Sequence, residues 1–152
     1  MIVLGIRNYS DGFRYCLLEK DSNGITCLNL NSENRVLIPK GFDDNQMLIW
    51  YQDEIKRVLD TNDRIDRVTI KHNENMRADC YTNLKKVMFM DCIVTLEVTK
   101  RAIPINSYVY NQIFVNSKNV SERAENLVGR SLKYWDSKIA DAIMAANKEF
   151  EI

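Results

Sequence analysis

The chain has 152 residues, of which 45% are hydrophobic, and its 21 basic and 21 acidic side chains leave no formal net charge. This length fits one globular domain spanning residues 1–152 and is too short for two ordinary domains. Because the net charge is zero, no global field attracts the protein to nucleic acid or to an anionic membrane, so binding of a polyanion requires a local basic patch.

The cysteines indicate a reducing compartment. They are scattered without a C-x-x-C pair, in apolar or helical contexts, at Cys16, Cys27, Cys80 and Cys92. This distribution favours reduced core thiols over disulfides or a zinc site. The chain also lacks the pattern of a signal peptide and any apolar run of the ~20 residues that a membrane helix needs. We therefore expect a soluble, cytoplasmic protein.

The first third of the chain has the pattern of strands. Residues 2–6 are apolar and predict a buried strand, and residues 13–18 predict its returning partner. Residues 24–30 alternate apolar and polar side chains after a turn at residues 21–24, which predicts a second hairpin. Three antiparallel strands in meander order result. The tip of the first hairpin carries Arg7, Asn8 and Asp11.

A helix and a further strand follow a short apolar piece at residues 35–39. From Asp43 or Asp44, either of which can cap a helix, the spacing predicts a helix of about four turns that ends before Asn62. Its apolar face comprises Met47, Leu48, Tyr51, Ile55, Val58 and Leu59. Residues 68–70 then predict a short buried strand, and the order strand, helix, strand favours parallel pairing with the first strand.

The segment 79–101 is ambiguous. A four-residue spacing typical of a helix connects Leu84, Met88, Cys92 and Leu96. Residues 94–98, however, alternate as a strand would, so we predict a long helix over the first half and leave the part beyond Cys92 open. Residues 102–105 predict a short strand, and residues 107–113 predict a helix.

The tail has the pattern of closing helices. Asn119 and Glu122 have the spacing of a capping box. An apolar stripe at helical spacing is formed by Trp135, Ile139, Ala142, Ile143, Ala146 and Phe150.

This element order resembles that of the ribonuclease H-like superfamily, an α/β fold with a mixed sheet flanked by helices. Residues 2–6, which run into a turn and a second strand, resemble the first strand of RuvC-type Holliday junction resolvases. Residues 139–146, IADAIMAA, resemble their closing helix, in which an Ala-Asp-Ala-Leu-like run carries an acid. Residues 68–71 stand where that family has an apolar strand ending in glutamate. The resemblance covers nearly the whole chain and implies a RuvC-like domain.

The resemblance also implies where catalytic acids would lie. RuvC-like nucleases hydrolyse a phosphodiester with two Mg²⁺ ions held by carboxylates. The four acid positions fall at Arg7, Lys71, Lys138 and Asp141, so one acid remains. Three cations at these positions would repel Mg²⁺. The resemblance thus implies the fold without catalysis or a cofactor, in a binding or accessory protein of a bacterial or phage cytoplasm.

Two other classes of function stay open. A relocated acid cluster of Asp11, Asp136 and Asp141 would make the protein a nuclease dependent on Mg²⁺ or Mn²⁺. Against this cluster, the first acid needs a rigid strand position, whereas Asp11 lies beyond the strand in the turn. A protein-interaction module is the third class.

Cations near the expected sheet edge are candidates for anion binding. Arg7, Lys71, His72 and Lys138 could contact phosphate or a nucleic-acid backbone. The basic stretch around them also includes Arg77, Lys85 and Lys86. The alternative is a solvated charged face, because acids lie among these cations at Glu74 and Asp79. His72, the only histidine, has the chemistry of a general base or a phosphate contact, but without a placed nucleophile a polar loop residue is the favoured interpretation.

Several aromatic residues have two interpretations, as stacking platforms for bases or as core and dimer contacts. They are Tyr108, Tyr110, Tyr134 and Trp135. Trp50 and Tyr51 adjoin on the first predicted helix and cannot both face the core. One of them therefore marks an exposed surface, and we expect a homodimer through that helix.

Overall fold

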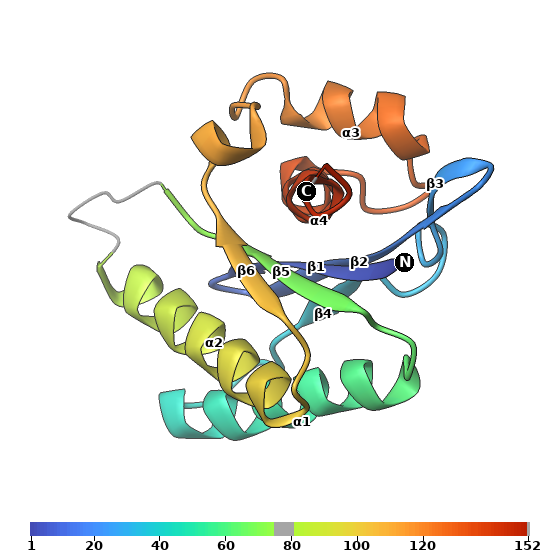
Figure 1. Ribbon diagram of the computed structural model, residues 1–152. Helices are drawn as coiled ribbons and strands as arrows, with labels where there is room; N and C mark the ends of the chain where they lie inside the picture. Colours follow the sequence, from blue (N-terminus) through green and yellow to red (C-terminus); the bar gives the residue numbers. More distant parts are fainter. Residues whose placement is uncertain (75–80, 152) are drawn as a thin grey trace.

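A six-stranded mixed sheet forms the centre of the molecule (Figure 1). The computed structural model describes residues 1–74 and 81–151. The strands are β1 (Ile2–Tyr9), β2 (Gly12–Asp21), β3 (Gly24–Cys27), β4 (Arg35–Leu37), β5 (Arg67–Lys71) and β6 (Ile105–Tyr108). Their order is β3-β2-β1-β5-β6, with β4 also paired to β2. The first three strands form an antiparallel meander, and β1, β5 and β6 run parallel to one another.

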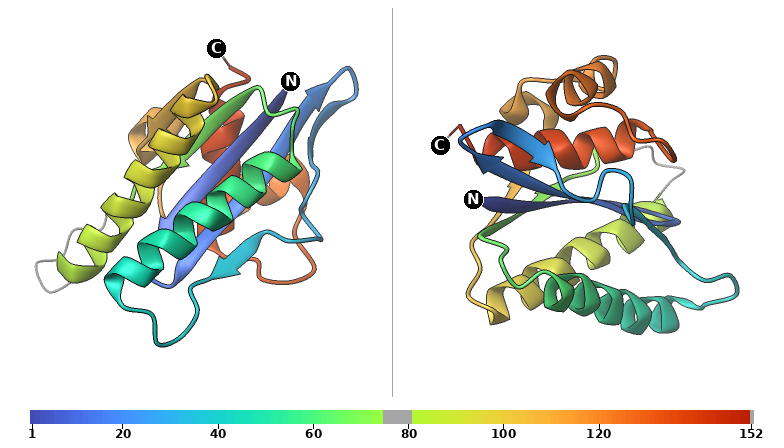
Figure 2. Two further views of the ribbon diagram at one scale, coloured as in Figure 1. Left: turned by 90° about the horizontal axis from the view of Figure 1, so that it is seen from below. Right: turned by 90° about the vertical axis from the view of Figure 1, so that its right-hand side faces the viewer.

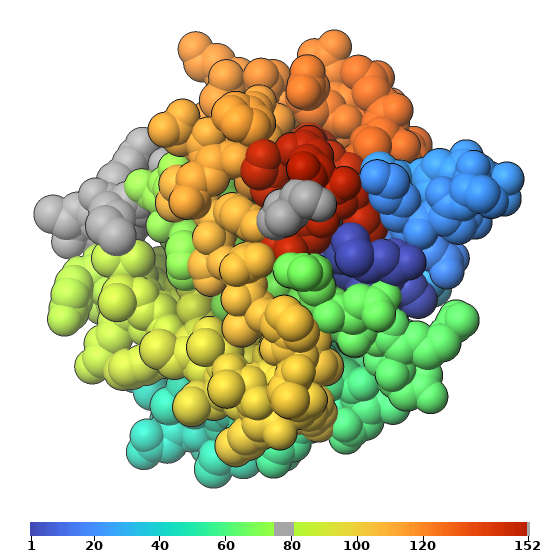
Figure 3. Space-filling model, viewed as in Figure 1, coloured from blue at the N-terminus to red at the C-terminus, as the bar shows by residue number. Residues whose placement is uncertain are grey.

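Helices cover both faces of this sheet. They are α1 (Asp44–Thr61), α2 (Tyr81–Lys100), the 3₁₀ helix η2 (Tyr110–Ile113), α3 (Val120–Val128) and α4 (Ser137–Lys148). Figure 2 shows α1 and α2 on one face and α4 on the other, with α3 outside α4. The beginning of β1 and the end of α4 lie close together on one face of the molecule (Figure 3). No helix within the described residues is both long and apolar enough to cross a membrane.

Because both faces of the sheet are covered, the central strands are apolar on both sides. Leu4 and Ile6 of β1 belong to the core beneath α1 and α2, and Val3 belongs to the core beneath α4. Arg7 has the same parity as Val3, so it extends from β1 on the α4 side of the sheet. Asn8 extends on the α1 and α2 side. The alternation of β1 thus decides which helix each polar residue at its end can reach.

Gly5 sets the distance between α4 and β1. A Cβ atom built on Gly5 would lie 2.2 Å from the carbonyl oxygen of Ala142 and 2.9 Å from the Cys16 sulfur. Ala140, Ala142 and their neighbours on α4 are fully buried against the sheet. A glycine on the strand and alanines on the helix therefore let the two backbones approach closely.

Most of the predicted elements are confirmed. The mixed α/β sheet, the meander of the first strands and the parallel pairing of β1 with β5 are as expected. Asp43 caps α1, and it exchanges capping-box hydrogen bonds with Gln46. The side chain of Asn119 instead accepts a hydrogen bond from the Asn116 amide, so α3 has no side-chain cap of the predicted kind.

The second half of the chain contains the corrections. Helix α2 continues to Lys100, because Val94 and Val98 lie one turn apart on its buried face. That face also includes Val87 and Met90, so the predicted stripe through Met88, Cys92 and Leu96 faces outward. Cys92 is therefore an exposed thiol, whereas Cys16 is buried, and Cys80 lies outside the described residues.

Four boundaries also differ from the predictions. Strand β3 ends at Cys27 rather than residue 30, because Asn29 turns the chain and hydrogen-bonds to the Leu17 amide. Strand β6 begins at Ile105, where the predicted strand ended. The predicted helix at residues 107–113 is reduced to η2, since its first two residues pair with β5. Trp135 precedes α4 rather than belonging to it.

We expect Gly5→Ala to lower the free energy of unfolding by about 3 kcal/mol, because the new methyl group meets a backbone carbonyl that cannot rotate away. Urea denaturation followed by circular dichroism measures this change. Adding Cys16→Ala to Gly5→Ala removes the sulfur but leaves the carbonyl, so it should restore little stability. Full recovery in the double variant would show that α4 does not approach β1 as closely as the structure has it.

Glu97 on α2 connects this helix to α1. Its buried carboxylate accepts hydrogen bonds from Gln52 of α1 at 2.8 Å and from Lys100 and Arg101 at 3.1 Å. Burial alone would raise the pKa of Glu97, but these three donors outweigh it and lower the pKa to about 2. A lowered pKa stabilises the folded state above the ordinary value of 4.5, and this stability is lost as the pH falls toward 2.

Replacing Glu97 with glutamine should therefore reduce the loss in the free energy of unfolding at acidic pH. The wild-type protein should lose free energy of unfolding as the pH falls from about 4.5 toward 2, and Glu97→Gln should lose less over the same range. Urea denaturation at a series of pH values provides the measurement. Glu125→Gln, at an exposed position of α3, should leave the loss at acidic pH unchanged. An equal dependence of the free energy of unfolding on pH in the wild type and in Glu97→Gln would contradict the lowered pKa of Glu97.

Candidate functional site

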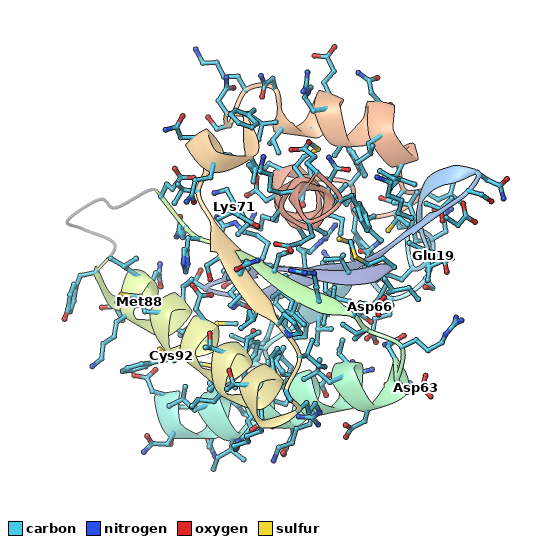
Figure 4. All side chains as sticks on the ribbon, in the orientation of Figure 1. Glu19, Asp63, Asp66, Lys71, Met88 and Cys92 are labelled. Carbon is cyan, nitrogen blue, oxygen red and sulfur yellow. The ribbon has the colours of Figure 1, made fainter. Side chains whose placement is uncertain are left out.

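The candidate site lies where the carboxyl ends of β1 and β5 meet. The two strands are parallel neighbours, so their last residues reach the same edge of the sheet. Helix α4 crosses this edge on one face, and the segment after β6 closes it on the side. Lys71 lies at the end of β5 (Figure 4). The fold thus brings together residues that are far apart in the sequence.

An ion pair joins β1 to α4 at this edge. The Arg7 Nε atom lies 2.9 Å from Asp141 Oδ2, and the two side chains are 11% and 2% exposed. Arg7 Nη1 also donates to the carbonyl of Asn8 at 2.5 Å. The second carboxylate oxygen of Asp141 accepts a hydrogen bond from the Tyr110 hydroxyl at 2.8 Å. Both oxygens of Asp141 are therefore occupied by protein donors.

Lys71 makes the second ion pair. Its side chain is 1% exposed, and its ammonium donates to Glu74 Oε2 at 2.6 Å and to the His72 carbonyl at 2.7 Å. The ammonium also lies 3.7 Å from the centre of the Tyr110 ring, an additional cation–π contact. Burial lowers the pKa of Lys71, and the attraction of Glu74 and Asp141 only partly offsets this effect.

Tyr110 links the two ion pairs. Its hydroxyl donates to Asp141, its ring lies under Lys71, and its backbone amide donates to Glu74 at 2.9 Å. Burial raises the pKa of Tyr110, and the negative charge of Asp141 raises it further, so the phenol stays protonated as a donor. Partial burial would raise the pKa of Glu74, but its donors, Lys71 and the Tyr110 amide, hold it below the ordinary value. We call these five residues, Arg7, Lys71, Glu74, Tyr110 and Asp141, the charge network.

A separate chain of hydrogen bonds lies on the opposite face of β1. Asn8 is fully buried; it accepts from the Tyr51 hydroxyl of α1 and donates to Asp91 of α2 at 2.7 Å. The other oxygen of Asp91 lies 3.0 Å from His72 Nδ1. His72 thus holds the segment after β5 to α2, while part of its ring is exposed.

Three arginines form a row across neighbouring strands. Arg7 of β1 is paired with Arg14 of β2, and Arg14 is paired with Arg35 of β4, so all three side chains extend on the α4 side. Like charges directly opposite each other destabilise a sheet unless partners neutralise them. We call these residues the arginine row. Asp141 neutralises Arg7, and Asp136 lies 3.7 Å from Arg14.

Three solved structures with a similar fold are Holliday junction resolvases. A Thermus thermophilus RuvC in complex with Holliday junction substrate superposes with a TM-score of 0.79 at 16% identity, over 97% of this chain and 92% of that one. A second Thermus thermophilus RuvC structure gives 0.74 at 16% identity, with the same coverage of both chains. The yeast mitochondrial Holliday junction resolvase gives 0.67 at 13% identity, over 96% of this chain and 76% of that one.

The chain has the RuvC fold. No protein-family model matches the sequence, and no curated protein does. The fold predicted by resemblance is thereby confirmed. Identities of 13% and 16% show the fold alone, so what the site does has to be argued from its own residues.

The RuvC fold brings most of the predicted site residues to one edge. Arg7, Lys71 and Asp141 meet in the charge network. Lys138, one turn before Asp141 on α4, is half-buried, and its ammonium lies 5.0 Å from the centre of the Tyr9 ring. His72 is at the same edge but faces α2 through Asp91.

Other members of the predicted basic stretch lie elsewhere. Lys85 and Lys86 are on α2, on the opposite face of the sheet from α4, and Lys85 packs over the Phe89 ring. Arg77 lies outside the described residues, as does the acidic Asp79. The predicted basic stretch is therefore not one continuous surface among the residues that the structure describes.

The alternative acids have separate roles. Asp136 is the N-cap of α4 and accepts hydrogen bonds from the amides of Lys138 and Ile139 at 3.0 Å. Asp11 is exposed in the hairpin turn, and Asp141 is paired with Arg7. In residues 1–74 and 81–151, no three histidine, cysteine, aspartate or glutamate side chains are grouped as a metal site requires.

The residues of the charge network do not fit a pair of Mg²⁺ ions. Magnesium takes hard oxygen ligands, and a pair of ions needs several carboxylates around it. Here a guanidinium and an ammonium stand at two of the acid positions implied by the resemblance, and they neutralise the two carboxylates present. The arrangement can hold the end of β1, the end of β5, η2 and α4 in fixed relation.

Replacing Arg7 should destabilise the protein strongly. Arg7→Ala leaves the buried Asp141 carboxylate without its cation, and we expect a loss of about 3 kcal/mol in the free energy of unfolding. Arg7→Ala with Asp141→Ala should recover part of this loss, because no buried charge is then unpaired. Urea denaturation of the single and double variants forms the required cycle.

The matched control is Arg57→Ala, which removes an exposed arginine paired with Glu33 and Glu54. Exposed ion pairs contribute little, so this variant should lose less than about 1 kcal/mol. Equal losses for Arg7→Ala and Arg57→Ala would mean that Asp141 does not depend on Arg7.

Proposed function

We propose that this chain is a RuvC-fold protein that binds nucleic acid without cleaving it and acts as a binding or accessory protein. The observation that carries the proposal is the ion pair between Arg7 and Asp141. A guanidinium occupies the strand position where the resemblance implies an aspartate, and it holds the acid that remains on α4. The carboxylate is thus committed to a protein cation.

Charge balance supports the absence of catalysis. The charge network contains two cations and two carboxylates, whereas two Mg²⁺ ions need a surplus of negative charge. To bind a metal ion, Asp141 would give up hydrogen bonds from Arg7 and Tyr110 while its neighbour Lys71 repelled the ion. Each of these changes has a cost in a buried site.

Cations at the rim of the site support binding to a phosphate backbone. Lys138 and Arg35 are half-buried on the α4 side, and His72 is partly exposed on the other side of the edge. We propose that Lys138 and His72 contact phosphates, whereas Arg7 and Lys71 maintain the surface from within. A structural neighbour, Thermus thermophilus RuvC, is described in complex with Holliday junction substrate, which motivates a branched DNA as the probe.

We also propose that the protein forms a homodimer through the outer face of α1 and α2. Tyr51 is fully buried and Trp50 is half-buried, so the exposed apolar residue on that part of α1 is Ile49. Ile49 and Phe89 of α2 line one hollow between the two helices, and Met88, next to Phe89 in the sequence, is also exposed. Figure 4 shows Met88 and Cys92 on the outside of α2. Apolar surface of this extent on two adjacent helices favours association.

A cytoplasmic location belongs to the same proposal. Cys16, Cys27 and Cys92 are free thiols, and Cys92 is exposed, which suits a reducing compartment. A bacterial or phage origin follows from the resemblance.

The test is a gel-shift titration of the protein with a four-way DNA junction, paired with a cleavage assay in Mg²⁺ and in Mn²⁺. We expect a complex whose affinity falls with salt, since backbone contacts release counterions, and no cleavage product in either metal. Lys138→Ala should weaken binding several-fold and reduce the salt slope by about one. Lys56→Ala removes a half-buried lysine of α1 on the other face and should change neither quantity.

Three results would overturn the proposal. Cleavage that disappears in Asp141→Asn and Asp136→Asn would show a nuclease with the relocated cluster of Asp11, Asp136 and Asp141. A millimolar or tighter two-metal site in a calorimetric titration would point the same way. Failure to bind any nucleic acid would favour the protein-interaction module instead.

A further inference from the structure

A stacked cation and aromatic ring lie at the exposed end of the arginine row. The guanidinium carbon of Arg35 lies 3.6 Å from the centre of the Tyr134 ring. Tyr134 is 53% exposed, and no second aromatic ring packs against it among the described residues. Arg35 makes no ion pair within residues 1–74 and 81–151, in contrast to Arg7 and Arg14. One face of the ring is thus backed by a cation that no local acid neutralises.

Contacts with neighbouring residues hold Tyr134 in its position. Its backbone has a φ of 61°, the left-handed region that a tyrosine rarely adopts, so surrounding contacts must hold it. Arg14 supplies one of them by donating from its guanidinium to the Tyr134 carbonyl. The neighbouring loop is also held, because the Leu132 amide donates to Asn31 at 2.9 Å. These contacts order the ring before any ligand binds, so less conformational entropy is lost on binding.

Arg14 provides a second, independent observation. Its side chain is 1% exposed, and its Nε atom has no hydrogen-bond partner among the residues described. Burial lowers the pKa of Arg14, and Arg35 acts in the same direction, while Asp136 opposes both. An excess of positive charge with incompletely used donors remains beneath Tyr134. Such a site is complementary to an anionic ligand that carries an aromatic group.

We propose that the Tyr134–Arg35 pair is a stacking platform for an unpaired nucleobase, with the adjoining phosphates held by Lys138 and by Arg35 itself. Every nucleobase has a π face, and aromatic side chains beside basic residues are the usual elements of single-strand binding surfaces. Tyr9 and Lys138 form a second ring and cation pair on the same side of the sheet, and Tyr9 interacts electrostatically with both Arg14 and Arg35. The platform rests on the proposed nucleic-acid binding and adds to it a preference for unpaired bases.

The test compares three labelled DNA probes of equal length by fluorescence anisotropy: a single strand of thymidines, an abasic single strand and a duplex. The abasic strand keeps the phosphates and lacks the bases. The wild-type protein should bind the thymidine strand about tenfold more tightly than the abasic strand. Tyr134→Ala should abolish this difference without changing the affinity for the abasic strand, and Tyr134→Phe should preserve it.

A direct readout and a matched control accompany these titrations. A single strand containing 2-aminopurine should lose fluorescence on binding to the wild type but not to Tyr134→Ala, because stacking quenches this base. Tyr81→Ala removes an exposed tyrosine at the start of α2 and should behave as the wild type. Thermal melts of all variants confirm that Tyr134→Ala remains folded.

The outcomes separate the platform from the proposed function. If the protein binds the strands but Tyr134→Ala weakens both equally, or neither, the platform is wrong while nucleic-acid binding stands. If the wild type binds none of the probes and no four-way junction, both proposals fail, and the exposed loop with Leu132 and Tyr134 is then a surface for a protein partner.

Discussion

The close approach of α4 to β1 is the constraint on which the site depends. Gly5 has no side chain, so the carbonyl of Ala142 reaches a point that a Cβ atom would occupy. Arg7 follows Gly5 by one pleat on the same side of the strand, and Asp141 precedes Ala142 on the helix. The contact that brings the backbones together therefore also brings a guanidinium against a carboxylate. Packing and electrostatics at this edge are set by the same few residues.

Charge placement within the edge follows from desolvation. An arginine and a lysine that are almost fully buried need partners, because an unpaired buried charge costs several kcal/mol, roughly 3–5 when one partner is removed. Asp141 and Glu74 provide those partners, and Tyr110 contacts both pairs. At this edge acids and bases therefore neutralise each other. The resulting network needs no ligand to be electrically satisfied.

Parts of the fold and the site that have a local sequence pattern could be predicted, whereas parts that depend on pairing between distant residues could not. The strand before Arg7, the capped helix α1 and the parallel strand β5 have local patterns, and the resemblance placed Arg7, Lys71 and Asp141 at one edge. The arginine row had no such signal, because Arg14 lies opposite Arg7 only in one register of the hairpin, and a slip by one residue would send its side chain to the other face.

Tyr110 and α2 are two further features that the local sequence pattern could not predict. Tyr110 lies in a short 3₁₀ helix, and only the folded chain reveals that its hydroxyl, ring and amide serve three different partners. In α2 two apolar faces compete, one through Met88 and Leu96 and one through Val94 and Val98. Periodicity cannot decide between them, since both have helical spacing; the sheet decides, by covering the face that carries Val94.

The three members of the arginine row differ in how their charges are neutralised. Arg7 has an acid within hydrogen-bonding distance, Arg14 has one at 3.7 Å, and Arg35 has an aromatic ring instead of an acid. Neutralisation by acids therefore decreases from β1 across β2 to β4, toward the exposed loop that carries Tyr134. Such a gradient leaves the attraction for anions toward the rim, where a ligand can reach it. This separation explains how one edge of the sheet can carry three arginines while the fold keeps its shape.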